Sequence, residues 1–197
     1  MVLNMIKEHN YIWTFTGKKL YPSALSTLDI DLIDLANGLG REDRFGNQND
    51  PHKKYSVAQH SWTIASMVPY NMKLYAMLHD GAEAYSHDMP KPIKEVMKDF
   101  KEFEDKLSSV IHLSFKLKPE TPEIIKELDS RIVIDEALQT FSNPPPWAIE
   151  NAKERLGIEI LPVNSDMASF IWLRYMYRLL GIVVPDATVL NQLRLSW

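Results

Sequence analysis

Two His–Asp pairs stand close together in the segment HDGAEAYSHDMPKPIK, residues 79–94. His79 and Asp80 are adjacent, in a stretch whose apolar residues follow a helical period, and neighbours on a helix point about 100° apart. Together they could coordinate one cation at the edge of the helix with two ligand atoms, whereas a single residue would offer only one. Imidazole nitrogens combined with carboxylate oxygens suit a divalent transition metal that keeps positions free for water or a substrate oxygen.

Such a metal site needs further ligands from other parts of the chain. His60 on the preceding predicted helix and Asp129 on a later one are available as third and fourth ligands. The chain has no cysteine, so histidines and carboxylates must hold any metal. The alternative interpretation is that His79 and Asp80 form a hydrogen-bonded pair in the core without a metal, which is the commoner role of an arbitrary His–Asp pair.

The elements that must position these residues are predicted to be helical almost throughout. The exception is the segment YIWTFTGKKLYP, residues 11–22, which predicts a short β-hairpin that turns at Thr16 and Gly17. Thr27 is expected to cap the first helix, which should end at Gly38 to Gly40.

A polar loop is predicted over residues 41–54, since this segment is rich in turn-forming residues. Ser56 followed by Gln59 forms a capping-box pattern, which predicts a helix from Val57 that stops at Pro69. Further helices are predicted from residue 71 to the prolines at 90 and 92, over 93–117, over 122–138 with Thr121 as its N-cap and Pro122 as its first residue, over 147–156 and over 165–180.

Length, composition and charge limit the functions to consider. The chain has 197 residues, of which 45% are hydrophobic and 24% charged, and this predicts one globular domain over residues 1–197. Its net charge is -4, so the chain lacks the basic character that binding of a nucleic-acid polymer requires. Neither a signal peptide at the start nor a run of 18 apolar residues is found, so we expect a cytoplasmic protein without a membrane partner.

The ordered set of His60, His79–Asp80 and Asp129 resembles the H…HD…D signature of the HD superfamily of metal-dependent phosphohydrolases. The pair Arg44–Phe45, the segment YSVAQHS at 55–61 and the segment at 79–94 extend this likeness. They follow the pattern of the small-domain branch that contains bacterial deoxynucleoside 5′-monophosphatases and phage dATP triphosphohydrolases. The resemblance covers about residues 12–142, whereas the expected packing helices of 147–197 match only in being helical.

The resemblance implies an all-α HD-domain helical bundle, here with the short N-terminal hairpin, and a set of site residues. It implies one divalent transition metal, namely Mn, Co, Zn, Fe or Ni, on His60, His79, Asp80 and Asp129. Glu83 lies three positions after Asp80 and therefore on the same helix face, close enough to hold a water or take its proton. Asp88 is the other candidate for positioning the attacking water, and the sequence does not rank the two.

The same resemblance implies four substrate contacts. Arg44 matches the phosphate-clamping arginine of the family, whose planar guanidinium binds phosphate oxygens in pairs. Phe45 corresponds to an aromatic residue that crowds the sugar and favours 2′-deoxyribose, although many relatives carry Trp there. Lys94 and Lys126 would add positive charge, and Lys126 lies three residues before Asp129, so the two share a helix face. Read alone, Arg44 would be a loop arginine, and either lysine could be a solvated helix residue.

Several other residues attract attention without joining the predicted site. Asp135 lies six positions after Asp129 and therefore about 240° round the helix. His87 could touch the site without being a ligand, and His52 and His112 have no partners at suitable spacing. The Met-rich and aromatic stretch at 167–179 is more typical of a core or a subunit interface than of a cofactor site.

Together these observations predict a metal-dependent phosphohydrolase of 2′-deoxynucleotides. Lys94 and Lys126 favour a triphosphate, with dATP first, which would give the deoxynucleoside and inorganic triphosphate. The main alternative is a deoxynucleoside 5′-monophosphatase. A phosphodiesterase of a cyclic or signalling nucleotide would need more histidines for a second metal, and a non-catalytic nucleotide-binding protein would not need Glu83 and Asp88. The resemblance further implies a homo-oligomer, located in the host cytoplasm if it is phage-encoded.

Overall fold

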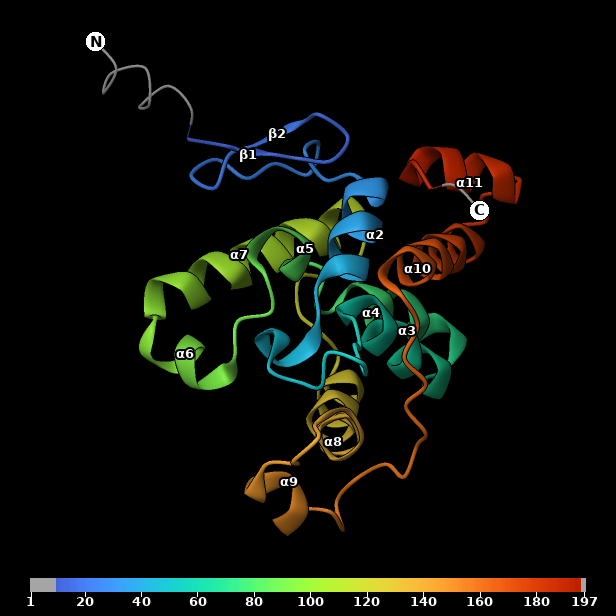
Figure 1. Ribbon diagram of the computed structural model, residues 1–197. Coiled ribbons are helices and arrows are strands. Elements are labelled where there is room, and N and C mark those ends of the chain that lie inside the picture. Colours follow the sequence, from blue (N-terminus) through green and yellow to red (C-terminus); the bar gives the residue numbers. More distant parts are fainter. Residues whose placement is uncertain (1–9, 196–197) are drawn as a thin grey trace.

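Helices make up most of residues 10–195, the part of the chain that the computed structural model describes (Figure 1). Within that part a two-stranded hairpin near the start is the one sheet. The prediction of an all-α fold with a short N-terminal hairpin is therefore confirmed. Residues 1–9 and 196–197, which belong to the predicted domain, lie outside the described residues.

The hairpin pairs β1 (Ile12–Trp13) with β2 (Lys19–Leu20) in antiparallel register, with Ile12 opposite Leu20. It turns where the sequence predicts, because Gly17 adopts a φ of +84°, a conformation that residues with a Cβ rarely take. Asp34 of the following helix accepts hydrogen bonds from the Thr16 backbone N–H (2.7 Å) and hydroxyl (2.8 Å). These bonds attach the hairpin to the helical part of the molecule.

The first helix described, α2 (Leu32–Arg41), begins and ends later than predicted. Asp31 is its N-cap and accepts a hydrogen bond from Ile33 N–H, so the prediction of Thr27 as the cap is wrong. Gly38 and Gly40 do not end the helix, because they serve packing instead. A Cβ on Gly38 would overlap the backbone of Ala84, and one on Gly40 would overlap Ser169.

The other elements follow in chain order. They are η1 (Arg44–Asn47), α3 (Val57–Met67), η2 (Tyr70–Met72), α4 (Lys73–Leu78), α5 (Glu83–Ser86), α6 (Lys91–Val96), α7 (Lys98–Ser114), α8 (Glu123–Thr140), α9 (Pro146–Glu150), α10 (Ser165–Leu179) and α11 (Asp186–Leu193). The predicted loop over 41–54 contains only the short 3₁₀ turn η1 beyond the end of α2.

The helix predicted from residue 71 to the prolines is interrupted at the His79–Asp80 pair. Residues 79–82 form a tight turn between α4 and α5, in which Gly81 N–H bonds to Leu78 C=O and Glu83 N–H bonds to Asp80 C=O. Gly81 lies against Ile111 of α7, at a point where a Cβ would meet that side chain at 3.2 Å. The apolar period does not reveal this turn, whose hydrogen bonds span three residues instead of the four of an α-helix.

Other predicted boundaries also need correction. Met97, with φ −105° and ψ 72°, divides the predicted 93–117 helix into α6 and α7. Pro122 takes the N-cap place of α8 that was predicted for Thr121. The predicted 147–156 helix is the shorter α9, and α11 was not predicted as a separate helix.

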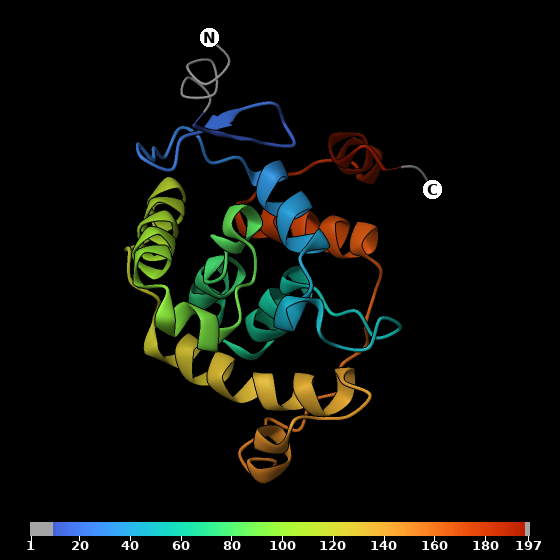
Figure 2. The same ribbon diagram turned by 60° about the vertical axis from the view of Figure 1, so that its left-hand side comes forward.

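The core runs through α2, α3, α4, α7, α8 and α10, with the indole of Trp172 among its largest fully buried side chains. Seen from the side, α8 crosses the molecule opposite the hairpin, and α9 lies beyond it (Figure 2). α8 also contacts α3, so these two helices and the turn at 79–82 can bring side chains to one place. No helix in the described part of the chain is long and apolar enough to cross a bilayer.

Candidate metal centre

Four side chains from three segments meet in the interior. Each offers one ligand atom, and these atoms all lie within 4.8 Å of one another; they belong to His60 of α3, His79 and Asp80 of the turn, and Asp129 of α8. His60 Nε2 lies 3.1 Å from His79 Nε2 and 3.1 Å from Asp129 Oδ1. The structure therefore brings the predicted ligands together into a group that could bind a metal ion.

Both imidazole rings are oriented by hydrogen bonds on the side away from the group. His79 Nδ1 donates to the Ala76 carbonyl at 2.8 Å, and since a carbonyl only accepts, the Nε2 atom carries a lone pair. His60 Nδ1 lies 2.6 Å from Glu136 Oε1 and donates to it in the same way. When both rings are neutral, their Nε2 lone pairs face each other at 3.1 Å, and a proton on His60 or a metal cation removes the repulsion between them. A metal cation fits this arrangement.

The electrostatics of the group also favour a cation. Burial and the nearby Arg44 act to lower the pKa of His60, but the carboxylates of Glu136 and Asp129 outweigh them and raise that pKa to about 10. Burial acts to raise the pKa of Asp129, yet the His60 and His79 rings hold it well below its usual range. Negative charge is therefore in excess around His60.

Arg44 lies at the start of η1 and reaches into the same group. The loop is held there because Arg44 N–H donates to Tyr55 C=O at 2.9 Å. The guanidinium then faces four carboxylates: Glu136 at 3.3 Å, Asp80 at 3.4 Å, Asp129 at 3.8 Å and Asp88 at 3.9 Å. Burial alone would lower the pKa of Arg44, but these carboxylates raise it above its ordinary value.

Phe45 stands in a strained turn beside the site. It has a φ of +61°, a conformation that is unusual for an aromatic residue. Its backbone N–H donates to Asp88 Oδ2 at 2.9 Å, which holds the turn. The ring lies edge-on to Phe141, with 5.1 Å between ring centroids. Phe45 therefore faces the end of α8.

The two candidates for proton transfer differ in their contacts. Glu83 is buried, with Oε1 bonded to Lys94 Nζ at 3.2 Å and Oε2 without a hydrogen-bond partner among residues 10–195. Burial, together with Asp80 and Asp88, raises the pKa of Glu83. Burial also raises the pKa of Asp88, but its Oδ2 is already occupied by the Phe45 N–H. Glu83 thus keeps a buried oxygen free to accept a proton.

The two predicted lysines have different surroundings. Lys94 of α6 lies 3.2 Å from Glu83 and 2.8 Å from Glu104, so two carboxylates share its charge. Lys126 is more than half exposed and lies 3.5 Å from Glu123. Lys126 nevertheless lines the same cavity as His79.

Glu136 and Glu104 are the site residues that the sequence reasoning missed. Glu136 lies seven positions after Asp129, two helical turns on and on the same face, so this spacing is a signal that could have found it. Glu104 lies on α7, and no spacing in the sequence relates it to Lys94.

The residues left out of the predicted site lie outside the ligand group. Asp135 accepts hydrogen bonds from the backbone N–H groups of residues 156–158, at 2.7 to 3.1 Å. His87 is exposed and bonds to Glu42, His112 donates to Pro119 C=O, and His52 lies in the exposed part of the loop.

Two cavities meet at the ligand group. The smaller has a volume of about 420 Å³ and is lined by His79 and Asp80 together with Glu83, Lys94, Glu104 and Lys126. The larger, of about 810 Å³, shares Asp80, Glu83 and Lys94 with the smaller one, and its other lining includes Arg44 and Asp129 together with apolar side chains such as Phe45, Phe141 and Trp147. A molecule could therefore place different parts in two chemically distinct spaces, with its centre at the metal group.

Comparison with known proteins gives two relatives, while no protein-family model matches the chain. An uncharacterized protein of Escherichia coli (strain K12), YfdR, is 34% identical over 120 residues, which cover 61% of this chain and 66% of that protein. The chain thus spans just under two thirds of this relative's length.

The second relative is an uncharacterized protein of Rhodobacter capsulatus, RCAP_rcc00048. It is 31% identical over 178 residues, which cover 79% of this chain and 89% of that protein. Likeness of this extent over most of both chains shows common descent, and the chain therefore belongs to the protein family that includes RCAP_rcc00048.

Proposed function

We propose that this protein is a metal-dependent phosphohydrolase of 2′-deoxynucleotides and a member of the HD superfamily that its motifs resemble. The observation that carries the proposal is the convergence of two Nε2 lone pairs and two carboxylates, from His60, His79, Asp80 and Asp129, where the two cavities meet. Arg44 beside them offers a guanidinium, a group whose planar fork can bind phosphate oxygens in pairs.

The chemistry can be assigned to residues of this chain. His60, His79, Asp80 and Asp129 would hold the divalent metal, which supplies Lewis acidity to the phosphoryl group and favours loss of a proton from water. Arg44 would bind phosphate oxygens and offset the charge that develops on them. Glu83 would accept the proton of the attacking water on its free Oε2, because a raised pKa brings a carboxylate closer to the operating pH. Asp88 would hold the Phe45 turn.

Within this proposal a triphosphate such as dATP is the expected substrate. Lys126 supports it, because this lysine lines the smaller cavity and makes one 3.5 Å ion pair, so its charge is available to distal phosphates. The alternative, a deoxynucleoside 5′-monophosphate, is supported by Lys94. The charge of Lys94 is already shared by Glu83 and Glu104, so less positive charge remains for the longer phosphate chain of a triphosphate.

A product screen tests the proposal. The purified protein, loaded with Mn or Co, is incubated with deoxynucleoside mono- and triphosphates and with cyclic nucleotides, and the released phosphates are identified. We expect hydrolysis of a deoxynucleotide, lost together with bound metal in His79→Ala and Asp80→Ala. Lys126→Ala should impair triphosphate cleavage far more than monophosphate cleavage.

Three outcomes would contradict the proposed phosphohydrolase function or the choice of a triphosphate as its substrate. Full activity in His79→Ala would end the metal-site interpretation. Tight nucleotide binding without any product from the metal-loaded protein would indicate a binding protein. Efficient release of orthophosphate from monophosphates, with triphosphates untouched and Lys126→Ala without effect, would indicate a 5′-monophosphatase.

A further inference from the structure

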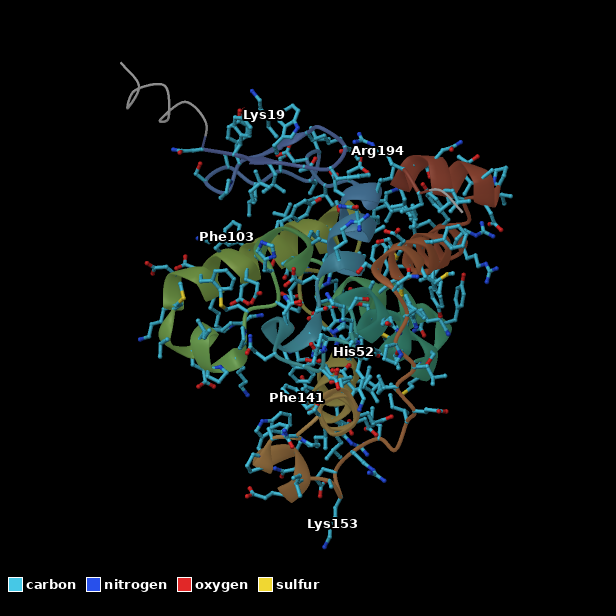
Figure 3. The ribbon with its side chains drawn as sticks, in the orientation of Figure 1. Lys19, His52, Phe103, Phe141, Lys153 and Arg194 are labelled. Atoms are coloured by element: carbon cyan, nitrogen blue, oxygen red, sulfur yellow. The ribbon has the colours of Figure 1, made fainter. Side chains whose placement is uncertain are left out.

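The wall of the larger cavity that faces the metal group is built by the end of α8 and by α9. Phe141, Pro145 and Trp147 contribute to it, from the segment FSNPPPW. Figure 3 shows Phe141 at the α9 side of α8, far from Lys19 and Arg194 at the opposite end of the molecule. Most of this segment lies beyond residues 12–142, which carry the resemblance.

The local sequence holds Trp147 in place. Pro145 is the N-cap of α9 and Pro146 its first residue, positions where the fixed φ of proline suits a helix start. Ala148 is fully buried, which anchors the short helix. Trp147 nevertheless remains 42% exposed, although an indole is among the largest apolar side chains. A rigid backbone thus presents a large aromatic ring to the cavity.

The two cavities differ in chemistry. The larger cavity is lined by two carboxylates of the metal group, Asp80 and Asp129, and by Arg44 beside them; its other charged lining residues are Glu83, Asp88, Lys91 and Lys94. The edge-to-face pair of Phe45 and Phe141 lines it together with Trp147. A volume of about 810 Å³ with mostly apolar walls is typical of a site for a small organic molecule. The smaller cavity has no aromatic side chain apart from His79 in the lining that the structure describes, so it offers less surface on which a flat ring could stack.

We infer that the larger cavity binds the nucleobase of the substrate and that Trp147 is the ring on which the base stacks. This inference rests on the proposed function, since the phosphates would then lie at the metal group. Stacking is tolerant of base identity because every base has a flat π face, and it grows with the area of the ring. Purine deoxynucleotides should therefore bind more tightly than pyrimidine deoxynucleotides, with the difference expressed in KM.

Binding measurements with partial substrates test this inference without requiring turnover. Calorimetric titration of the full chain uses 2′-deoxyadenosine, which lacks phosphate, and 2-deoxyribose 5-phosphate, which lacks the base. In Trp147→Ala we expect the affinity for 2′-deoxyadenosine to fall about ten-fold or more, the usual scale for loss of a stacking partner. Binding of 2-deoxyribose 5-phosphate should stay the same, and Trp147→Phe should retain most of the nucleoside affinity.

Trp13→Ala is the matched control, because Trp13 is a 63% exposed indole of the hairpin that does not line this cavity. It should bind both probes as the wild type does. Thermal melts of all variants serve to check that each variant keeps the wild-type fold.

Failure of the inference is distinguishable from failure of the proposed function. Absence of nucleoside binding to the wild type, or equal losses for both probes in Trp147→Ala, would overturn it. A change in the self-association of Trp147→Ala with unchanged nucleoside binding would also overturn the inference, because it would indicate that Trp147 forms a contact between subunits. If no deoxynucleotide is hydrolysed but Trp147→Ala still loses 2′-deoxyadenosine binding selectively, the base site stands and the proposed function fails.

Discussion

At the scale of single residues, Glu136 connects the two central positive groups of the site. It is fully buried, with one oxygen 2.6 Å from His60 Nδ1 and the other 3.3 Å from Arg44 Nε. Burial acts to raise its pKa, but His60 and Arg44 outweigh burial and lower it, so the carboxylate stays ionised. Glu136 therefore sets both the tautomer of His60 and the position of the Arg44 guanidinium.

Replacing Glu136 should weaken metal binding without removing a ligand. Glu136→Gln keeps the size of the side chain but removes the charge that orients His60, and loss of such an outer hydrogen bond lowers metal affinity by roughly 10- to 100-fold. Competition with a chelator measures this affinity. Asp135→Asn is the control on the same helix, since Asp135 contacts the backbone of 156–158 instead. Equal metal affinity in Glu136→Gln and wild type would contradict the positioning role.

Glu83→Gln should separate proton transfer from metal binding. The variant keeps a side chain of the same shape beside Lys94 but cannot accept a proton, so turnover should fall by ~100-fold or more with metal content unchanged. Steady-state rates and metal analysis of the same sample are the measurements. A fully active, metal-replete Glu83→Gln protein would move the role to Asp88.

At the scale of elements, the close approach of neighbouring helices decides which residues α2 can hold. The helix packs on α5 and α10 through Gly38 and Gly40, and a Cβ at either position would overlap atoms of Ala84 or Ser169. Alanine favours a helix over glycine by about 1 kcal/mol, but overpacking a tight interface costs about 1–3 kcal/mol. Packing should therefore outweigh helix propensity at these positions.

Gly38→Ala should accordingly lower the free energy of unfolding, by up to about 2 kcal/mol. Denaturant titration followed by circular dichroism measures the change. Asn37→Ala on the same helix is the control, because this side chain makes only an exposed hydrogen bond to Arg41 and its loss should matter little. A Gly38→Ala protein more stable than wild type would show that α2 can move away from α5.

His112 of α7 should make stability depend on pH. It is fully buried, and burial lowers its pKa below the ordinary value of about 6.5. The unfolded chain therefore binds a proton at pH values where the folded chain does not, so stability is lost as the pH falls below that value. His112→Gln keeps a donor for the Pro119 carbonyl but does not titrate.

The comparison of melting temperatures between about pH 7.5 and about pH 5.5, with chelator present, tests this expectation. Wild type should lose more stability over this interval than His112→Gln does. Parallel curves for the two proteins would mean that His112 becomes protonated in the folded state as easily as in the unfolded chain.

At the scale of the whole molecule, the metal group links segments that are far apart in the sequence. His60, the turn at 79–82 and Asp129 come from α3, the α4–α5 connection and α8. A ligand that binds the folded state alone stabilises it by mass action, by about 2.7 kcal/mol at a concentration 100 times its dissociation constant. The cation should thus stabilise the tertiary fold and not one helix.

Metal removal is therefore expected to lower the melting temperature of the wild-type protein. Mn or Co added back after chelation should restore it by several degrees, and the increase should depend on metal concentration. His79→Ala should show little or no increase, because it lacks one ligand. An equal increase in both proteins would place the stabilising cation somewhere else.

The homo-oligomer implied by the resemblance stays a prediction that light scattering of the same samples can test.

The sequence by itself determined the residue types of the site and the helical character of its supports. His60, His79, Asp80 and Asp129 could be selected because their chemistry and order are visible along the chain, and the structure brings them together. The hairpin turn at Gly17 and the Ser56 cap of α3 were also predictable, since both depend on hydrogen bonds and dihedral angles of residues adjacent in sequence. Gln59, however, completes no capping box and bonds instead to Leu161 and Val163.

Only the tertiary structure decided features that depend on partners distant in the chain. The close packing of Gly38 in α2 on Ala84 and the contact of Lys94 with Glu104 both join separate helices. Trp147 faces the larger cavity because α8 and α9 carry it there. Apolar periodicity indicates that a helix face is buried. It does not indicate which other helix lies against that face or how closely the two backbones approach. The distance between packed helices decides which residues fit at the contact and which charges meet.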